Sequence, residues 1–193
     1  MTKIFLQKYS HRNKNTRPKL ISGFTLVETL VAISILTVAM VGTLTAIQSG
    51  LKDTTIAKDQ IIAFYLAQEG MEFVRNIIDE NILHSLGGSS TDWLASLSSI
   101  STDACYFGKT CRIDSNAKTI VNCASGAGSC PVLNIDSVSG LYGYTSAWPG
   151  STFKREIQFQ SVSANEVLAI ITISWTNRGT PQSFQVSELF FNR

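Results

Sequence analysis

Hydrophobic residues are concentrated in one long run near the N-terminus. Residues 24–47 (FTLVETLVAISILTVAMVGTLTAI) include a single charge, Glu28, and no proline. As an α-helix this run spans roughly 36 Å at about 1.5 Å per residue, which is enough to cross the core of a bilayer with some tilt. Because a cleavable secretory signal has an apolar region of only about 7–15 residues, the pattern predicts a transmembrane helix over residues 24–50.

The helical pattern continues through residues 51–86, which contain no proline. A polar stripe recurs there at steps of four, three and four, and it consists of Gln68, Glu72, Arg75 and Asp79. The opposite face is apolar and consists of Ile62, Ala63, Leu66, Ala67, Phe73, Val74, Ile77 and Ile78. We therefore predict one helix from Phe24 to about Leu86, about 90 Å long, with an amphipathic second half that ends at Gly87-Gly88.

The C-terminal part of the chain alternates with the period of a β-strand. Phe153, Ile157 and Phe159 alternate with polar residues, which predicts a half-buried strand. Val167–Trp175 is β-branched and apolar on both faces at first, as in a central strand, and Gln182–Phe191 forms a third strand. Short turns join the three strands, so we predict an antiparallel meander that covers the helix. The fold class is α+β.

Charge divides the chain into a basic N-terminal tail and an acidic remainder. Residues 1–23 contain six basic residues and no acidic ones, whereas the rest of the chain has ten basic and fourteen acidic residues. Positive charge before an apolar span keeps that end cytoplasmic and sends the rest across the membrane. We therefore expect a single-pass protein whose residues 87–193 form an extracytoplasmic domain. The acidic remainder gives no support to nucleic-acid binding.

All the cysteines fall in one short stretch: Cys105, Cys111, Cys123 and Cys130. They include no C-x-x-C pair, and the two histidines, His11 and His84, lie far away in sequence. This pattern favours disulfides in an oxidising compartment over zinc ligation. Three connectivities are possible, and we expect the one with short local loops, Cys105–Cys111 and Cys123–Cys130.

No catalytic motif is present in the sequence. It contains no G-x-S-x-G, H-E-x-x-H, P-loop or G-x-G-x-x-G. His84 is expected to be a helix-end residue near the negative end of the dipole. Glu69 and Glu72, near Arg75, are interpreted as a solvated or paired helix face rather than a metal site. We expect a protein that is not an enzyme and that needs no metal or cofactor.

Residues 22–28 (SGFTLVE) resemble the type IV prepilin signature, in which a small residue precedes the cut, Phe follows it and Glu stands four positions further on. Residues 66–79 (LAQEGMEFVRNIID) and the C-terminal meander, with Ser174-Trp175-Thr176 and Arg178-Gly179, are similar to minor pilins of the pilus-modification type. The resemblance implies a pilin-like fold, in which the long helix packs on the sheet.

The resemblance also implies a course of maturation. A membrane prepilin peptidase would cut between Gly23 and Phe24, remove the leader 1–23 and methylate the amino group of Phe24. An assembly platform in the bacterial inner membrane would then move the subunit out of the lipid and into a filament with other pilin or pseudopilin subunits. The mature protein would end at the cell surface.

Glu28 is the residue in the apolar run that most needs an explanation. A carboxylate in a membrane span costs about 2.5–3.5 kcal/mol on insertion scales. The resemblance implies that the positively charged N-terminus of a neighbouring subunit pairs with it and sets the axial register of the helices. The alternative is that Glu28, one turn into the span, reaches the headgroup region by snorkelling.

The sequence departs from the family pattern in three places, of which the second, a missing proline, favours a minor or tip subunit over a bulk one. The leader is long, with Ser22 where lysine is common; the late apolar segment lacks the proline of many major pilins; and the cysteines precede the meander. We expect a structural minor pilin that primes, caps or decorates a pilus. The alternatives are a pseudopilin of a type II secretion or DNA-uptake system, and an uncleaved single-pass binding or sensor protein; a tethered enzyme is the weakest option.

Overall fold

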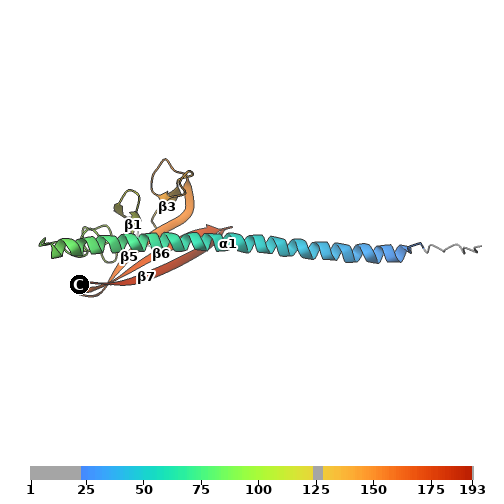
Figure 1. The fold of residues 1–193 in the computed structure, drawn as a ribbon, viewed down its shortest axis with the longest axis horizontal. Helices are drawn as coiled ribbons and strands as arrows, with labels where there is room; N and C mark the ends of the chain where they lie inside the picture. Colours follow the sequence, from blue (N-terminus) through green and yellow to red (C-terminus); the bar gives the residue numbers. More distant parts are fainter. Residues whose placement is uncertain (1–22, 124–127, 193) are drawn as a thin grey trace, which may run out of the picture. The chain divides into compact units, whose positions relative to one another are not determined.

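The computed structural model describes residues 23–123 and 128–192, so the leader residues 1–22 lie outside the described part. One helix, α1 (Leu26–Leu86), precedes the strands of an antiparallel sheet (Figure 1). The strands are β1 (Cys111–Asp114), β2 (Thr119–Asn122), β3 (Val132–Ile135), β4 (Tyr142–Gly143), β5 (Gly150–Ser163), β6 (Glu166–Asn177) and β7 (Thr180–Phe191). The α+β class and the long apolar helix packed on a sheet, as in a pilin-like fold, are confirmed.

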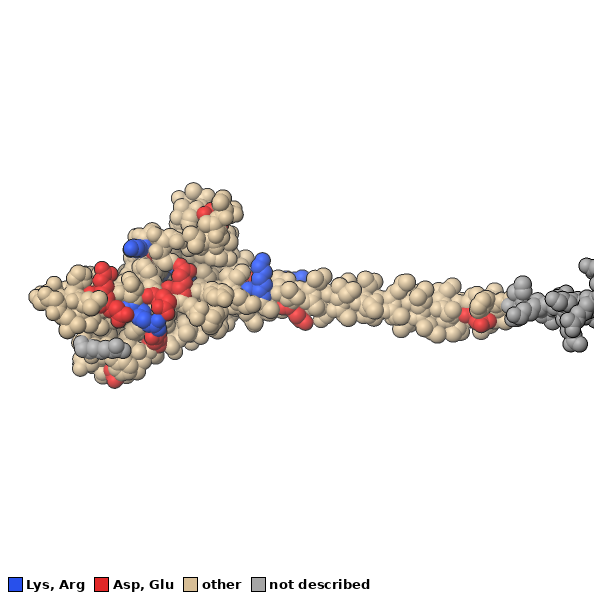
Figure 2. Space-filling view, in the orientation of Figure 1, with Lys and Arg blue, Asp and Glu red and all other residues tan. Residues whose placement is uncertain are grey.

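The chain divides into two compact units, with the boundary between Ser49 and Gly50. The described part of the first unit, residues 23–49, is helical from Leu26 and every one of its residues is exposed. By length and composition this helix is able to cross a membrane. Figure 2 shows charged groups of both signs over the second unit, whereas the helix of the first unit is tan apart from one acidic group.

The sheet of the second unit is built around β5. One edge of β5 pairs with β6 over most of its length, and the other edge pairs with β3 and, through Ile157 and Cys111, with β1. β2 and β4 extend the sheet as short outer strands on β1 and β3. The meander β5–β6–β7 is confirmed, and its strands are longer than the apolar alternation predicted, because polar residues continue the ladder at both ends.

The loop between β6 and β7 has the geometry of a tight hairpin turn. Asn177 pairs with Thr180, which leaves Arg178 and Gly179 as a two-residue loop. Their φ angles are 49° and 83°, so both central residues have the positive φ of a type I′ turn, whose twist matches that of the flanking strands. The loop length fixes the register of β7 on β6 without an irregularity.

The second half of the helix packs on the sheet through the predicted apolar face. Its buried residues are Ala63, Leu66, Ala67, Gly70, Met71, Val74 and Ile78, with Ile62, Phe73 and Ile77 partly buried beside them. Each large aliphatic side chain buried in this way contributes about 1.5–3 kcal/mol. The polar stripe is exposed except for half-buried Arg75, whose hydrogen bonds to Glu188 on β7 raise the pKa of the guanidinium.

Gly70 and Met71 belong to this interface although the sequence pattern did not include them. A Cβ at position 70 would lie 3.0 Å from Cδ1 of Ile171 and 3.3 Å from Cδ of Arg155. A glycine therefore allows the helix to approach β5 and β6 closely at this point, which outweighs its low helix propensity of about 1 kcal/mol relative to alanine.

Arg155 is the residue that the sequence interpretation missed. It is in phase with Phe153, Ile157 and Phe159 on β5, so it faces the helix, and it is fully buried. Its Nη1 donates to the Leu66 carbonyl at 3.2 Å and lies 3.3 Å from a Glu69 carboxylate oxygen, while Nη2 donates to the Ile113 carbonyl at 2.8 Å. One guanidinium thus joins α1, β1 and β5.

Glu69 completes this arrangement, since its other carboxylate oxygen accepts from the Ser115 hydroxyl. The expectation that Glu69 and Glu72 form a solvated or paired face is confirmed, because Glu72 pairs with Arg75 at 2.5 Å. The Glu69 side chain is 37% exposed, so water screens its attraction to Arg155 and the two carbonyl bonds are the stronger restraints.

The C-terminal end of α1 has the predicted glycine cap. Gly88 has a φ of +94°, the Gly88 amide donates to the Ser85 carbonyl, and the Ser89 amide donates to the His84 carbonyl. This pair of bonds is a Schellman motif, which satisfies carbonyl groups that the helix leaves without partners. His84 lies in the last turn, as expected.

The cysteines form the disulfides Cys105–Cys111 and Cys123–Cys130, which is the connectivity expected from the short loops. Cys111 is the first residue of β1, and Cys123 and Cys130 lie between β2 and β3. Glu156 of β5, itself buried, accepts from the amides of Gly128 and Cys130. The disulfides restrict a loop-rich segment that has little regular structure of its own.

Replacement of Arg155 by alanine is expected to destabilise the second unit by about 3–5 kcal/mol, because it leaves a cavity and removes the donors of two buried carbonyl groups. The change can be measured by chemical denaturation of the full chain in detergent. Gln160→Ala, on the exposed end of the same strand, is the control and should change the free energy of unfolding by less than about 0.5 kcal/mol. Equal effects of the two substitutions would contradict the assignment of Arg155.

Candidate processing and assembly site

The predicted processing residues lie immediately before the helix. Gly23, Phe24 and Thr25 are not helical, and α1 begins at Leu26, two residues later than the apolar pattern predicted. The reason is that Thr25 caps the helix: its Oγ1 accepts from the Glu28 amide at 3.2 Å and its carbonyl accepts from the Thr29 amide at 3.2 Å. The scissile bond proposed from sequence therefore lies in non-helical chain, just outside the cap.

Thr25 and Glu28 have the spacing of a capping box. In this motif a Thr at the cap and a Glu three residues later satisfy amides in the first helical turn. A carboxylate at this position also interacts favourably with the positive end of the helix dipole. The T-x-x-E pattern in residues 25–28 was the available sequence signal for the cap, and the sequence interpretation used these residues only as part of the prepilin signature.

The fold of the chain does not require glycine at position 23. A Cβ added there would meet no atom within 4 Å, and its φ is not in the left-handed region. Phe24 is 80% exposed, so it fills no core position. Packing within the described residues therefore does not explain why glycine stands at position 23 and phenylalanine at position 24.

The hydroxyl groups within the apolar run are satisfied inside the helix. The side chains of Thr29, Ser34, Thr37, Thr43 and Thr45 each donate to a backbone carbonyl three or four residues earlier, at 2.8–2.9 Å. In lipid, an unsatisfied polar group costs on the order of several kcal/mol. Hydroxyl groups that bond to carbonyls of their own helix therefore suit a membrane span. In contrast, the described part of the chain supplies no side-chain partner for Glu28.

Phe24 lies four residues before Glu28, just outside the helix, and both are exposed. The structure thus brings the three predicted processing and assembly residues, Gly23, Phe24 and Glu28, into one short segment of the first unit. The four cysteines belong to the second unit, where they have structural roles.

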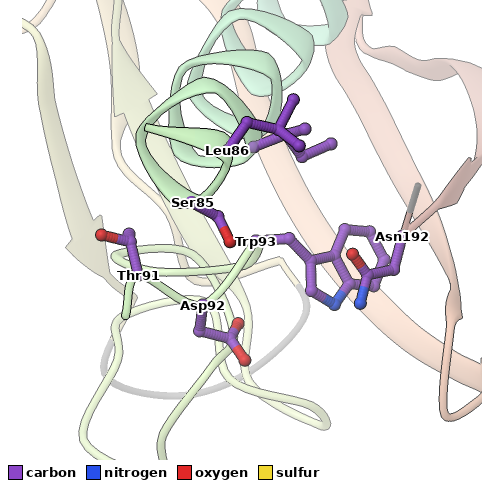
Figure 3. A pocket seen from close by; sticks show the side chains of 7 residues that line it. Ser85, Leu86, Thr91, Asp92, Trp93 and Asn192 are labelled. Atoms are coloured by element: carbon purple, nitrogen blue, oxygen red, sulfur yellow. The ribbon is translucent and has the colours of Figure 1, made fainter. Parts of the chain in front are cut away.

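The described part of the second unit has several hollows in its surface. A hollow at the end of α1, of about 230 Å³, is lined by Ile82, Ser85, Leu86, Thr91, Asp92, Trp93 and Asn192 (Figure 3). Figure 3 shows the Trp93 ring beside Asn192, with Asp92 turned away from both. Among residues 23–123 and 128–192, no group of three His, Cys, Asp or Glu side chains is arranged to hold a metal ion.

The pKa shifts in the second unit have structural causes. Burial raises the pKa of Tyr144 to about 12, and the Arg112 guanidinium lies 4.4 Å from the centre of its ring. A hydrogen bond from the Ser139 hydroxyl lowers the pKa of Asp136 within an exposed loop. Both shifts follow from the local packing and hydrogen bonding of the folded domain.

A family model described as the prokaryotic N-terminal methylation motif matches residues 19–44. No curated protein and no solved structure shows a significant match. The matched segment contains the candidate cleavage site, the cap and most of the apolar run, and it makes the chain type IV prepilin-like. The motif is that of pilins and pseudopilins, which are structural proteins anchored in membranes, processed by prepilin peptidase and assembled with one another.

Thr25→Ala is expected to weaken the start of α1 by about 1 kcal/mol, because the Glu28 amide loses its acceptor. Amide hydrogen exchange of the full chain in micelles should then be faster at Glu28 and its neighbours. Thr25→Ser keeps an acceptor oxygen and should retain the protection of the parent chain. If alanine and serine give the same exchange rate, Thr25 is not the cap.

Proposed function

We propose that this chain is a structural minor pilin of a type IV pilus, which is cut by prepilin peptidase between Gly23 and Phe24 and then assembled through its N-terminal helix. The observation that supports this most directly is the segment before the cap. Gly23 and Phe24 are exposed, lie outside the helix and make no packing contact with the described residues that would require them, and they lie inside the matched methylation motif. Exposed, non-helical chain beside a capped helix is accessible to a peptidase.

The proposed division of the chain follows from this role. Residues 1–23 are the leader, residues 24–50 span the inner membrane and later pack in the filament, residues 51–86 continue the helix, and residues 87–193 are extracytoplasmic. The basic leader keeps the N-terminus cytoplasmic. The disulfides Cys105–Cys111 and Cys123–Cys130 suit the oxidising side of the membrane.

Glu28 has a specific role in the proposed assembly. Cleavage leaves a methylated, positively charged amino group on Phe24, and this group of one subunit would pair with Glu28 of its neighbour. At 4 Å and an effective dielectric constant of 20, two unit charges attract by about 4 kcal/mol. This is of the same order as the 2.5–3.5 kcal/mol or so that the carboxylate costs in the span. The pairing therefore offsets the burial and defines the axial position of one helix on the next.

The minor rather than bulk role is supported by the four cysteines upstream of the meander and by the uninterrupted apolar helix. Other pilin-type subunits, the peptidase, the assembly platform and, before assembly, membrane lipid would be the partners. The methylation motif is equally compatible with a pseudopilin. Recovery of the chain in sheared surface filaments would favour the pilus over a short secretion pseudopilus.

Gly23→Val is expected to block processing without disturbing the fold, because a Cβ at position 23 meets none of the described residues but a larger side chain would obstruct a peptidase. The full chain would be produced in membranes with a prepilin peptidase, and intact-mass and N-terminal analysis would follow. The parent chain should begin with methylated Phe24, and Gly23→Val should begin with Met1. Gly42→Ala, at another uncrowded glycine, is the control and should be cut. A parent chain that still begins at Met1 would refute the proposal.

Glu28→Gln removes the charge and keeps the size of the side chain. We expect cleavage and methylation to persist, while the amount of the chain in sheared filaments falls about tenfold or more, which corresponds to a loss of about 1.4 kcal/mol. Asp53→Asn, beyond the apolar run, should assemble normally. Normal assembly of Glu28→Gln would show that Glu28 does not set the register.

A further inference from the structure

Strand β7 forms a long edge of the sheet. Its twelve residues, Thr180–Phe191, pair with β6 along their whole length. Within the described residues, no strand pairs with the other side of β7. In Figure 1 the three long strands lie side by side along the helix, with β7 as the outer member.

The hairpin turn determines which backbone groups of β7 face this free edge. Asn177 and Thr180 flank a two-residue loop, so they exchange both of their backbone hydrogen bonds. Every second residue from Thr180 onward therefore bonds to β6, and the intervening residues direct their N–H and C=O groups outward. After Pro181 these outward residues are Ser183, Gln185, Ser187, Leu189 and Phe191, and all five are exposed.

The edge lacks the features by which proteins usually prevent pairing. Free edges are commonly short, charged, bulged or interrupted by proline. β2 and β4 satisfy this rule by length, with four and two residues. β7 has no bulge, no lysine or arginine, and its proline stands at its second position. Its one acidic residue, Glu188, points to the helix and is paired with Arg75.

We propose that the free edge of β7 accepts an extended strand of a neighbouring, different pilin-type subunit, so that the sheet continues from one subunit into the next. This proposal rests on the proposed function, since it assumes assembly with other subunits. The backbone of residues 183–191 supplies alternating donors and acceptors, and such a row is satisfied most completely by another strand. The edge offers polar side chains at Ser183, Gln185 and Ser187 and apolar ones at Leu189 and Phe191, so the partner strand should show the same change along its length.

A second copy of this chain fits the edge less well. The Phe64 ring packs against Phe184, and Arg75 binds Glu188 further along both elements, so β7 runs in the same direction as this part of the helix. Two copies joined by antiparallel β7 strands would have helix segments 50–86 in opposite directions. Under the proposed function, subunits drawn from one membrane into one filament would share a direction. The other edges of a second copy, β2 and β4, are too short to pair with residues 183–191.

Ser187 allows the backbone contribution to be separated from that of the side chain. Ser187→Pro removes an outward N–H group without taking a bond from the β6–β7 ladder, and proline is tolerated at such edge positions. Ser187→Ala removes the hydroxyl and keeps the N–H. Both variants should retain methylated Phe24 and the thermal unfolding midpoint of the parent chain within a few degrees.

The experiment uses the full chain in cells that assemble the filament, with a photo-crosslinking amino acid in place of Ser183. We expect a crosslink to a strand of another pilin-type subunit. Ser187→Pro should reduce both the crosslink and the amount of the chain in sheared filaments about tenfold. Ser187→Ala should leave both unchanged. Gln185→Lys, which places a charge on the edge, should also reduce the crosslink and serves if Ser187→Pro does not fold.

Four outcomes would overturn the inference. These are equal crosslinking by Ser187→Pro and Ser187→Ala, a crosslink to a second copy of this chain, a crosslink that Gln185→Lys leaves unchanged, and no crosslink from position 183 in assembled filaments. In each case normal cleavage after Gly23 and normal incorporation of the parent chain would leave the proposed function intact. A parent chain that is neither cut nor incorporated would instead refute the proposed function, and the inference with it.

Discussion

The packing of the helix on the sheet depends on one buried cation. Arg155 has no exposed surface. Its Nη1 donates to the Leu66 carbonyl of the helix and its Nη2 to the Ile113 carbonyl of β1, while its Nε has no partner among the described residues. A guanidinium buried in this way must keep these acceptors, because the cost of an unpaired buried charge is several kcal/mol, roughly. The helix therefore has one rotation and one axial position on β5 in which this requirement is met, whereas apolar contacts alone would tolerate small shifts.

Glycine at position 70 leaves room for Arg155 to reach its carbonyl acceptors. The Arg155 stem and Ile171 occupy the space where a side chain at position 70 would lie. Further along the helix, Arg75 binds Glu188 of β7. The two arginines, one from the sheet and one from the helix, attach α1 to β5 and to β7. These two contacts hold the meander in a fixed position on the helix, and β7 is its outer strand.

The parts of the fold that depend on local pattern could be predicted from the sequence. The Gly88 cap, the turn at Arg178-Gly179 and the short disulfide loops each follow from a few adjacent residues. Arg155 could not be recognised in the same way, although its position in phase with Ile157 was available, because a charged residue is normally placed at the surface. Its acceptors come from residues about 40 and 90 positions away in the chain, and only the folded structure brings them together. The position of β7 at the edge of the sheet also depends on how the strands pair and not on the composition of β7.

The assignment of Gly23, Phe24 and Glu28 to processing and assembly stays a prediction from the sequence signature. The structure adds the cap at Thr25, which explains why the helix begins only at Leu26. Before cleavage, the Glu28 carboxylate lies near the positive end of the dipole of its own helix. Cleavage under the proposed function adds a full positive charge at Phe24, four residues before Glu28, at the membrane surface. The carboxylate then lies between the new amino group of its own chain and that of a neighbour, and removal of water in a filament strengthens both attractions. Processing would in this way create the charge that assembly uses, so a subunit that has not been cut lacks the partner for its neighbour's Glu28.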